Sequence, residues 1–135
     1  MNYDPMTPIW LQVATELKRE IVTGKIQPGE KLPGGRDLAL RFEINPNTAA
    51  RIYQELEREK VCATRRGLGT FVTADREMIA ALRREMAEDA ARRYLRELQG
   101  LGLSREEGAR LLKETDAERP AHETGEEKNP SLDGN

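Results

Sequence analysis

Residues 36–60 read RDLALRFEINPNTAARIYQELEREK, and this stretch decides the fold. Apolar residues recur at spacings of three and four on both sides of an interruption at 43–45, which is typical of two helices. Asn45 is a good N-cap and Pro46 suits the first helical position, so the second helix begins sharply and runs to about Lys60. Two helices joined by so short a connection form a helix-turn-helix.

The flanking segments complete a small domain around this motif. Before it, a helix is expected from about Ile9 to Thr23, with Thr7 as its cap. After it, residues 61–65 and 70–73 are short strand candidates, and the glycine-rich residues 66–69 join them as a hairpin. Three helices followed by this hairpin predict a mainly α fold with a small β-hairpin wing, the winged helix-turn-helix.

The next segment predicts two helices that carry an uncovered apolar stripe. Asp75 to about Gln99 contains no Pro or Gly, and Ser104 forms a capping box with Glu107 that opens a last helix to about Thr115. Two helices cannot bury two apolar faces alone, so a second copy of the chain is the natural partner. The stripe can also pack in a core, and its further alternative use is a pocket for an apolar effector. The expected dimerisation residues are Met78, Ile79, Leu82, Met86, Tyr94, Leu95, Leu98, Leu111 and Leu112.

Charge is unevenly distributed along the 135 residues, although the total is only −2. Residues 1–74 carry eleven Lys/Arg against nine Asp/Glu, residues 75–115 carry nine of each, and residues 116–135 carry two against six. We therefore expect three parts: a mildly basic winged domain (1–74), a helical dimerisation region (75–115) and a disordered acidic tail (116–135).

The composition bears on location as well. No apolar run approaches the roughly 20 residues that a membrane span needs, so no membrane partner is expected. The first residues lack the basic stretch and apolar core of a secretory signal. The single cysteine, Cys62, rules out a disulfide framework within the chain and suits a reducing compartment. A cytoplasmic protein is expected.

Six short pieces between residues 8 and 72 carry a family resemblance. They are PIWLQ (8–12), GEKLP (29–33), RDLA (36–39), NPNT (45–48), YQELE (53–57) and GLGTFV (67–72). In this order and spacing they resemble the GntR family of bacterial transcription regulators, and NPNT with the short helical tail resembles its YtrA-type branch. The resemblance covers roughly residues 5–115. It implies a homodimeric, repressor-type DNA binder whose C-terminal helices dimerise, without a large effector domain.

The second helix of a helix-turn-helix places its N-terminal residues in the major groove of double-stranded DNA. Here those residues include Asn45, Asn47, Thr48 and Arg51. The Asn47 amide suits an adenine edge, Thr48 can reach a phosphate or a thymine methyl, and Arg51 can reach guanine or a phosphate. The alternative role of Asn45 is capping alone. The alternative for the other three is a place on the solvated surface without a contact to DNA.

Further arginines flank this helix. Arg36 opens the preceding helix, where an arginine contacts DNA in the family; its alternative is an ion pair with an acid such as Glu43. Arg65, Arg66 and Gly67 form the wing tip. Glycine lets a tip enter a narrow minor groove, and the negative potential of that groove attracts arginine. The alternative is an ordinary solvated hairpin.

The sequence departs from the family's pattern at four positions. The family usually has Ser at Gly34, Gly at Glu43 and Lys60, and Lys or Arg at Leu68. Glu43 puts a negative charge beside the turn, which counts against tight phosphate contact there. Lys60 must end its helix without the ease of glycine in the left-handed region. Leu68 removes a wing cation and offers an apolar contact instead.

Other chemistry has little support. The single histidine, His122, lies in the acidic tail, so we expect no histidine-based catalytic or metal site. Gly67-Leu68-Gly69 lacks the third glycine of a dinucleotide fingerprint, and no cofactor is expected. Cys62 is expected to be a buried small residue, with a redox sensor as the alternative. The sequence therefore does not predict an enzyme.

These observations predict a dimeric regulator, of repressor type, that occludes a promoter at an inverted-repeat operator. The family resemblance suggests a transporter operon as the target and leaves the effector open. One rival is a low-specificity architectural DNA-binding protein, whose affinity would depend little on operator sequence. The other is a protein-interaction adaptor, which would not be retained on DNA at low salt.

Overall fold

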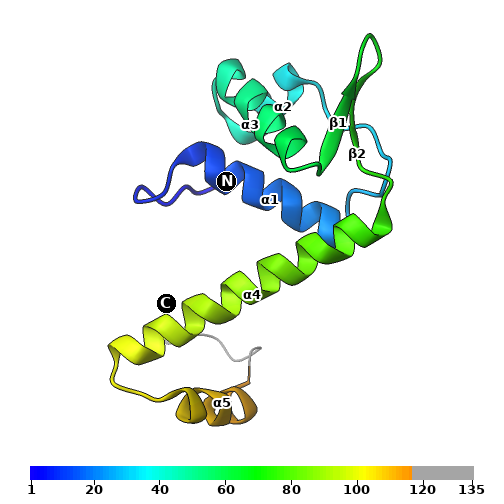
Figure 1. Cartoon of the computed structure of the whole chain (residues 1–135). Helices are drawn as coiled ribbons and strands as arrows, with labels where there is room; N and C mark the ends of the chain where they lie inside the picture. Colours follow the sequence, from blue (N-terminus) through cyan, green and yellow to red (C-terminus); the bar gives the residue numbers. More distant parts are fainter. Residues whose placement is uncertain (117–135) are drawn as a thin grey trace, which may run out of the picture. The chain divides into compact units, whose positions relative to one another are not determined.

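The computed structural model describes residues 1–116, so the expected disordered tail at 116–135 lies outside the described residues except for Asp116. The elements in chain order are α1 (Ile9–Val22), α2 (Gly35–Phe42), α3 (Pro46–Arg58), β1 (Cys62–Arg65), β2 (Gly69–Val72), α4 (Arg76–Gly100) and α5 (Arg105–Glu114) (Figure 1). The expected mainly α fold with a hairpin wing is confirmed. Two compact units, Met1–Asp89 (the winged unit) and the residues from Ala90 onward (the C-terminal unit), divide the chain within α4.

The helix-turn-helix forms where the sequence predicts it. The Asn45 side chain accepts a hydrogen bond from the Asn47 backbone N–H at 2.7 Å, and Pro46 is the first residue of α3. Glu43, which follows α2, has a left-handed backbone with φ of 55°, and Lys60, after α3, has φ of 65°. Both positions are among those where the family usually has glycine. The left-handed region is unfavourable for residues with a Cβ atom, so Glu43 and Lys60 are strained there.

The start of α1 differs from the expectation. Thr7 does not cap the helix: Pro8 is the N-cap and no side chain completes the cap. The Thr7 hydroxyl instead donates to the Asp4 carboxylate at 3.0 Å, because a turn brings that stronger acceptor within reach. The Gln12 amide holds this turn by donating to the carbonyls of Asp4 and Thr7 at 2.7 and 2.8 Å.

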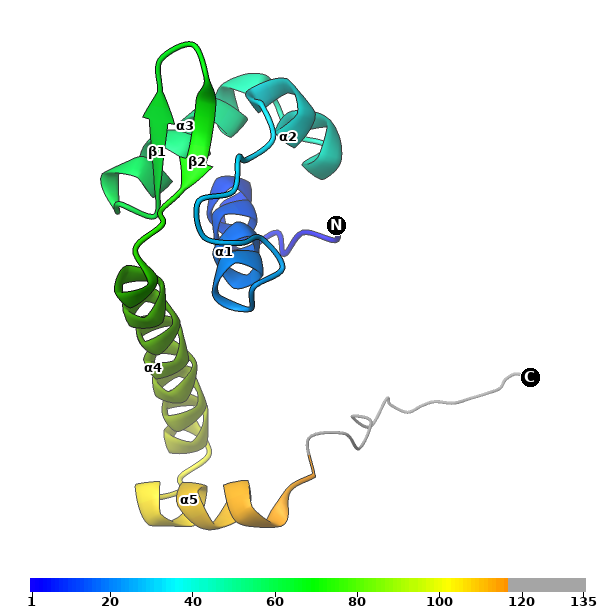
Figure 2. The same ribbon diagram turned by 90° about the vertical axis from the view of Figure 1, so that its right-hand side faces the viewer.

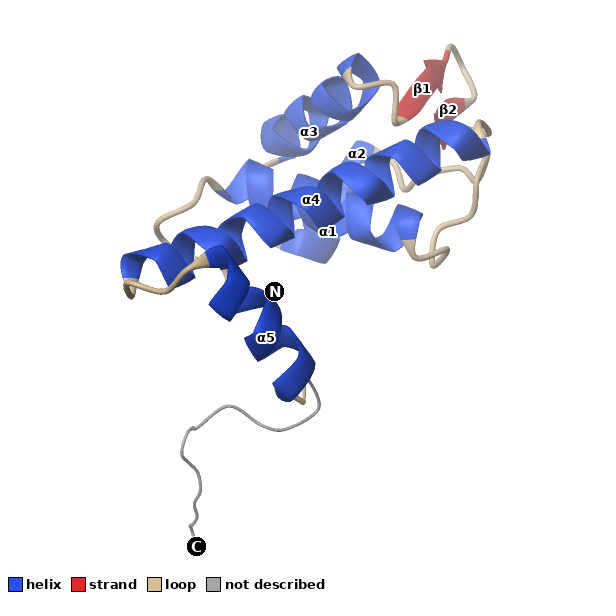
Figure 3. Ribbon diagram, turned by 60° about the horizontal axis from the view of Figure 1, so that its bottom comes forward, coloured by secondary structure: helices blue, strands red, loops and turns tan. Residues whose placement is uncertain are grey.

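The wing is an antiparallel hairpin in which Cys62 pairs with Val72 and Arg65 with Gly69 (Figures 2 and 3). A third segment extends it, because Lys31 forms a β-bridge with Phe71. The backbone N–H of Leu32 donates to the Thr70 carbonyl at 2.8 Å in the same ladder. The loop before α2 is thereby fastened along β2.

The core of the winged unit lies between α1, α2, α3 and the hairpin. Its most deeply buried large side chains include Leu17, Leu38, Ile52 and Leu56. The first half of α4 contributes as well: Leu82 belongs to this core, and Ile79 and Met86 pack against it. Leu82 is buried within one chain, whereas Ile79 and Met86 are only partly buried, and their predicted part in a dimer stays a prediction.

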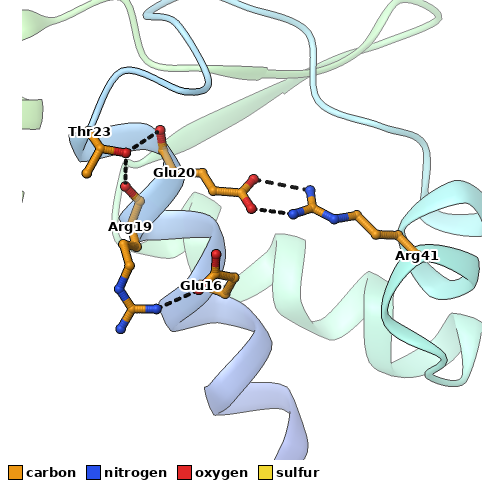
Figure 4. Close-up of polar contacts among 5 residues, drawn as sticks. All are labelled: Glu16, Arg19, Glu20, Thr23 and Arg41. Atoms are coloured by element: carbon orange, nitrogen blue, oxygen red, sulfur yellow. Dashed lines mark hydrogen bonds and ion pairs between the residues drawn. The ribbon is translucent and has the colours of Figure 1, made fainter. Parts of the chain in front are cut away.

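An ion pair between the exposed Arg41 and the buried Glu20 joins α1 to α2 in the winged unit (Figure 4). The Glu20 side chain is 5% exposed and accepts hydrogen bonds from both terminal nitrogens of Arg41, one of them at 3.1 Å. The Arg41 guanidinium also lies 4.5 Å from the Phe42 ring centroid. Burial raises the pKa of Glu20, but the hydrogen bonds and charge of Arg41 outweigh burial and hold that pKa below its ordinary value.

The C-terminal unit contains the end of α4 and all of α5. The capping box of Ser104 and Glu107 is confirmed, with both reciprocal hydrogen bonds formed. The two helices approach closely at Gly108, where a Cβ atom would lie 2.6 Å from Leu98 Cδ1. The Tyr94 hydroxyl donates to the Gly108 carbonyl at 2.8 Å. Among residues 1–116, no helix has the length and apolar character needed to cross a membrane.

Candidate nucleic-acid interface

The beginning of α3 presents polar side chains to solvent. Asn47 and Arg51 are exposed and Thr48 is partly buried. The Oδ1 atom of Asn45 accepts the capping hydrogen bond, so the geometry favours the capping role of this residue. Its Nδ2 group is left for other partners. One turn separates Asn47 from Arg51, so both side chains lie on one side of the helix.

Arg36 lies exposed in the first turn of α2. Within the described residues no ion pair joins it to Glu43 or to any other acid. The N-cap of α2 is Gly34, and a Cβ there would meet nothing within 4 Å. The family's serine would therefore fit this position and could supply the side-chain cap that α2 lacks.

The wing tip is also exposed and cationic. Arg65, Arg66 and Gly67 are exposed, and no ion pair within residues 1–116 involves either arginine. Gly67 has φ of 78°, a conformation that the tight tip requires and that glycine adopts without strain. Leu68 is 60% exposed beside it. The Arg65 guanidinium lies 4.8 Å from the Phe71 ring centroid, which orients it along the hairpin.

Sequence reasoning missed two contacts that shape this surface. The Arg51 guanidinium stacks over the Trp10 ring of α1, 4.5 Å from its centroid. The stem of Lys31 crosses Gly69, where a Cβ would lie only 2.7 Å from Lys31 Cε. Both contacts join segments far apart in the chain, so no local spacing signals them. The motifs PIWLQ and GEKLP contain the partner residues and were the available clue.

The remaining chemistry of the described residues is sparse. Cys62 is 3% exposed, and burial, with a smaller effect of Glu57, raises the pKa of its thiol to about 11. A thiol held protonated in this way supports the buried, unreactive interpretation of Cys62. Residues 1–116 contain no group of three or more His, Cys, Asp or Glu side chains placed to hold a metal ion. His122 lies outside the described residues.

Comparison with known proteins places the chain among regulators. The family model "Bacterial regulatory proteins, gntR family" matches residues 10–72. The chain is 36% identical over 106 residues to the HTH-type transcriptional regulator YhcF of Bacillus subtilis, covering 78% of this chain and 88% of YhcF. It is 43% identical over 67 residues to the HTH-type transcriptional repressor YtrA of the same organism, covering 50% of this chain and 52% of YtrA.

Solved structures agree with these sequence matches. A GntR family transcriptional regulator from Listeria monocytogenes superposes with a TM-score of 0.78 at 33% identity, covering 84% of this chain and all of the other. The DNA-binding domain of AraR in complex with operator ORX1 superposes with a TM-score of 0.51 at 28% identity, covering 54% of this chain and 93% of the other. These relatives are transcriptional regulators, a class that is not enzymatic. The motifs, the winged fold and the matched lengths together show that the chain belongs to the GntR family of DNA-binding bacterial transcriptional regulators.

Proposed function

We propose that this regulator is a cytoplasmic repressor that binds an inverted-repeat operator as a homodimer. The proposal rests on a set of exposed arginines at three places in the winged unit. Within residues 1–116 these arginines form no ion pair with an acid. They lie at the start of α2, near the start of α3 and at the wing tip, and they are Arg36, Arg51, Arg65 and Arg66. The relative YtrA is named a repressor, which supports the direction of regulation.

Within this interface the residues have different roles. Asn47 reads an adenine edge with its amide, and Thr48 contacts a phosphate or a thymine methyl. Arg36 contacts the edge of the major groove, while Asn45 shapes the start of α3 through its cap. Arg65, Arg66 and Gly67 enter the minor groove at the wing tip.

The second copy of the chain joins at the C-terminal unit. Leu101 and Leu112 are 76% and 63% exposed, and Leu111 is 36% exposed, in a unit that buries little of its own apolar surface. Tyr94 and Leu95 are partly buried and leave further apolar surface available. Dimerisation places two winged units on two half-sites, which doubles the few phosphate contacts that one mildly basic unit can make.

Selection from a random duplex library by the full-length chain tests the proposal. We expect an inverted repeat to be enriched, and Asn47→Ala to lose about 1–3 kcal/mol of binding on the enriched duplex and little on an unrelated one. Equal losses on both duplexes would refute Asn47 as a base reader. If no sequence is enriched but the chain still binds DNA in a salt-dependent way, the result would favour the low-specificity architectural protein. If the chain does not bind DNA even at low salt, the result would favour the protein-interaction adaptor.

A further inference from the structure

We propose that Trp10 positions Arg51 for a DNA phosphate by stacking on its guanidinium and holding it away from Glu43. The inference rests on the proposed DNA-binding role of α3. It adds a residue of α1, which lies outside the helix-turn-helix, to the machinery of recognition.

The stack fixes a cation that would otherwise be free. The Arg51 Cζ atom lies 4.5 Å from the centroid of the Trp10 ring. Trp10 is partly buried and packs against the core of the winged unit, so the ring is a fixed platform. Stacking uses the flat face of the guanidinium and leaves its N–H donors, which lie in the plane, available for a phosphate.

Glu43 is the competitor for the same guanidinium. Glu43 and Arg51 line one surface hollow beside the start of α3, together with Ile9, Trp10, Ile44, Asn45 and Thr48. A carboxylate is a strong partner for arginine and can bind it through two parallel hydrogen bonds. Even so, no ion pair joins Glu43 to Arg51 in the described structure, and the guanidinium lies on the ring instead.

The difference between these two partners matters for DNA. An Arg51 paired with Glu43 would be neutralised, and binding a phosphate would first require that pair to break. An Arg51 stacked on Trp10 keeps its full charge and its donors. Because the ring anchors the guanidinium to α1, at the flank of α3, we assign it a phosphate and not a base edge. Trp10 thereby offsets the unfavourable charge that Glu43 places at the turn.

The test compares four full-length proteins: wild type, Trp10→Leu, Glu43→Gln and the double variant. Binding is measured by fluorescence anisotropy over a range of salt, on the duplex enriched by selection and on an unrelated duplex of equal length. Trp10→Leu should weaken binding about tenfold on both duplexes, and the slope of log affinity against log salt should fall by about 1. Glu43→Gln in the Trp10→Leu background should restore most of the affinity, because the competing carboxylate is gone.

Several results would overturn the inference. Unchanged binding by Trp10→Leu, a loss confined to the enriched duplex, or a loss that Glu43→Gln does not restore would each contradict it. Trp10→Phe, which keeps an aromatic face and perturbs packing less, should retain binding within about threefold. Once Arg51→Gln is present, Trp10→Leu should have no further effect on binding, and a persisting effect would show that Trp10 acts only through folding. Failure of the wild type to bind either duplex would refute the proposed function itself.

Discussion

The two units of this chain differ in how completely they cover their own apolar residues. In the winged unit, Leu17, Ile52 and Leu56 are fully buried within one chain. In the described part of the C-terminal unit, Leu98 is buried beside Gly108, but Leu101 and Leu112 remain largely exposed. The first unit has the core of a domain that folds alone, whereas the second has the surface of one that needs a partner. The following experiments test that contrast.

The largest effect is expected at Leu82, which lies on α4 but belongs to the core of the winged unit. Leu82→Ala should lower the free energy of unfolding by about 2–4 kcal/mol, because it leaves a cavity in a packed core. Urea unfolding followed by Trp10 fluorescence at several protein concentrations measures this change. Self-association under folding conditions should persist; a stable, monomeric variant would instead place Leu82 in the dimer interface.

The ion pair of Arg41 with the buried Glu20 should give the next largest effect. Arg41→Met leaves the Glu20 carboxylate buried without its partner and should cost about 2–3 kcal/mol, less than a fully buried pair because water reaches Arg41. The matched control is Arg19→Met, whose pair with Glu16 is exposed and should change stability by less than about 0.5 kcal/mol. Equal effects would show that burial of Glu20 does not matter.

The same variant should weaken a pH dependence of stability. In the wild type the pKa of Glu20 is lowered in the folded state, so its contribution to stability is present above the ordinary carboxyl pKa and is lost as pH falls through the folded value. Without Arg41, burial is opposed only by the charge of Lys25 and the hydrogen bond with Glu16, so the pKa of Glu20 should rise and less stability should be lost as pH falls. Thermal unfolding between about pH 3 and 6 distinguishes the two slopes.

Substitutions at exposed leucines of the C-terminal unit should weaken self-association and leave the free energy of unfolding nearly unchanged. Replacing Leu111 and Leu112 together with Glu should weaken self-association at least about tenfold, because two apolar side chains can no longer be buried by a partner. Light scattering over a dilution series measures it, and urea unfolding of the dilute protein should be nearly unchanged. Leu68→Glu is the control that should leave the dimer intact, because Leu68 is about as exposed as Leu112 but lies on the wing.

The smallest effects are expected at the two left-handed positions of the winged unit. Glu43→Gly and Lys60→Gly should each raise its stability by about 0.5–1 kcal/mol, because glycine removes the strain of a positive φ. Glu59→Gly is the matched control: its φ is −82°, so glycine relieves nothing there and should destabilise. Stabilisation by Glu59→Gly would argue that chain flexibility, not local strain, sets these values.

Helix ends were predictable from sequence because capping acts within one turn of chain. Asn45 caps α3 and Ser104 forms its capping box with Glu107, as their spacing predicts. The prediction that Thr7 caps α1 is wrong for an equally local reason. Asp4, three residues earlier, offers the Thr7 hydroxyl a charged acceptor. Where two short-range partners compete, spacing alone does not rank them.

Contacts between distant segments were not predictable in this way. The periodicity of α4 predicts an apolar face but does not say what covers it, and Leu82 is covered by the winged unit's own core. The bridge from Lys31 to Phe71 and the stack of Arg51 on Trp10 depend on where separate segments meet. For the interface, sequence reasoning chose exposed residues such as Arg36 and Asn47; their contacts with DNA stay a prediction.

The burial of Cys62 allows another position on the wing to be labelled selectively through an added cysteine. Its buried thiol, with a pKa of about 11, reacts with a maleimide only when β1 separates from its neighbours. A second cysteine placed at the tip, as in Arg66→Cys, can therefore carry a dye in the native protein while Cys62 stays unlabelled. In the chain without that substitution, slow modification of Cys62 itself times the opening of the hairpin, with and without DNA.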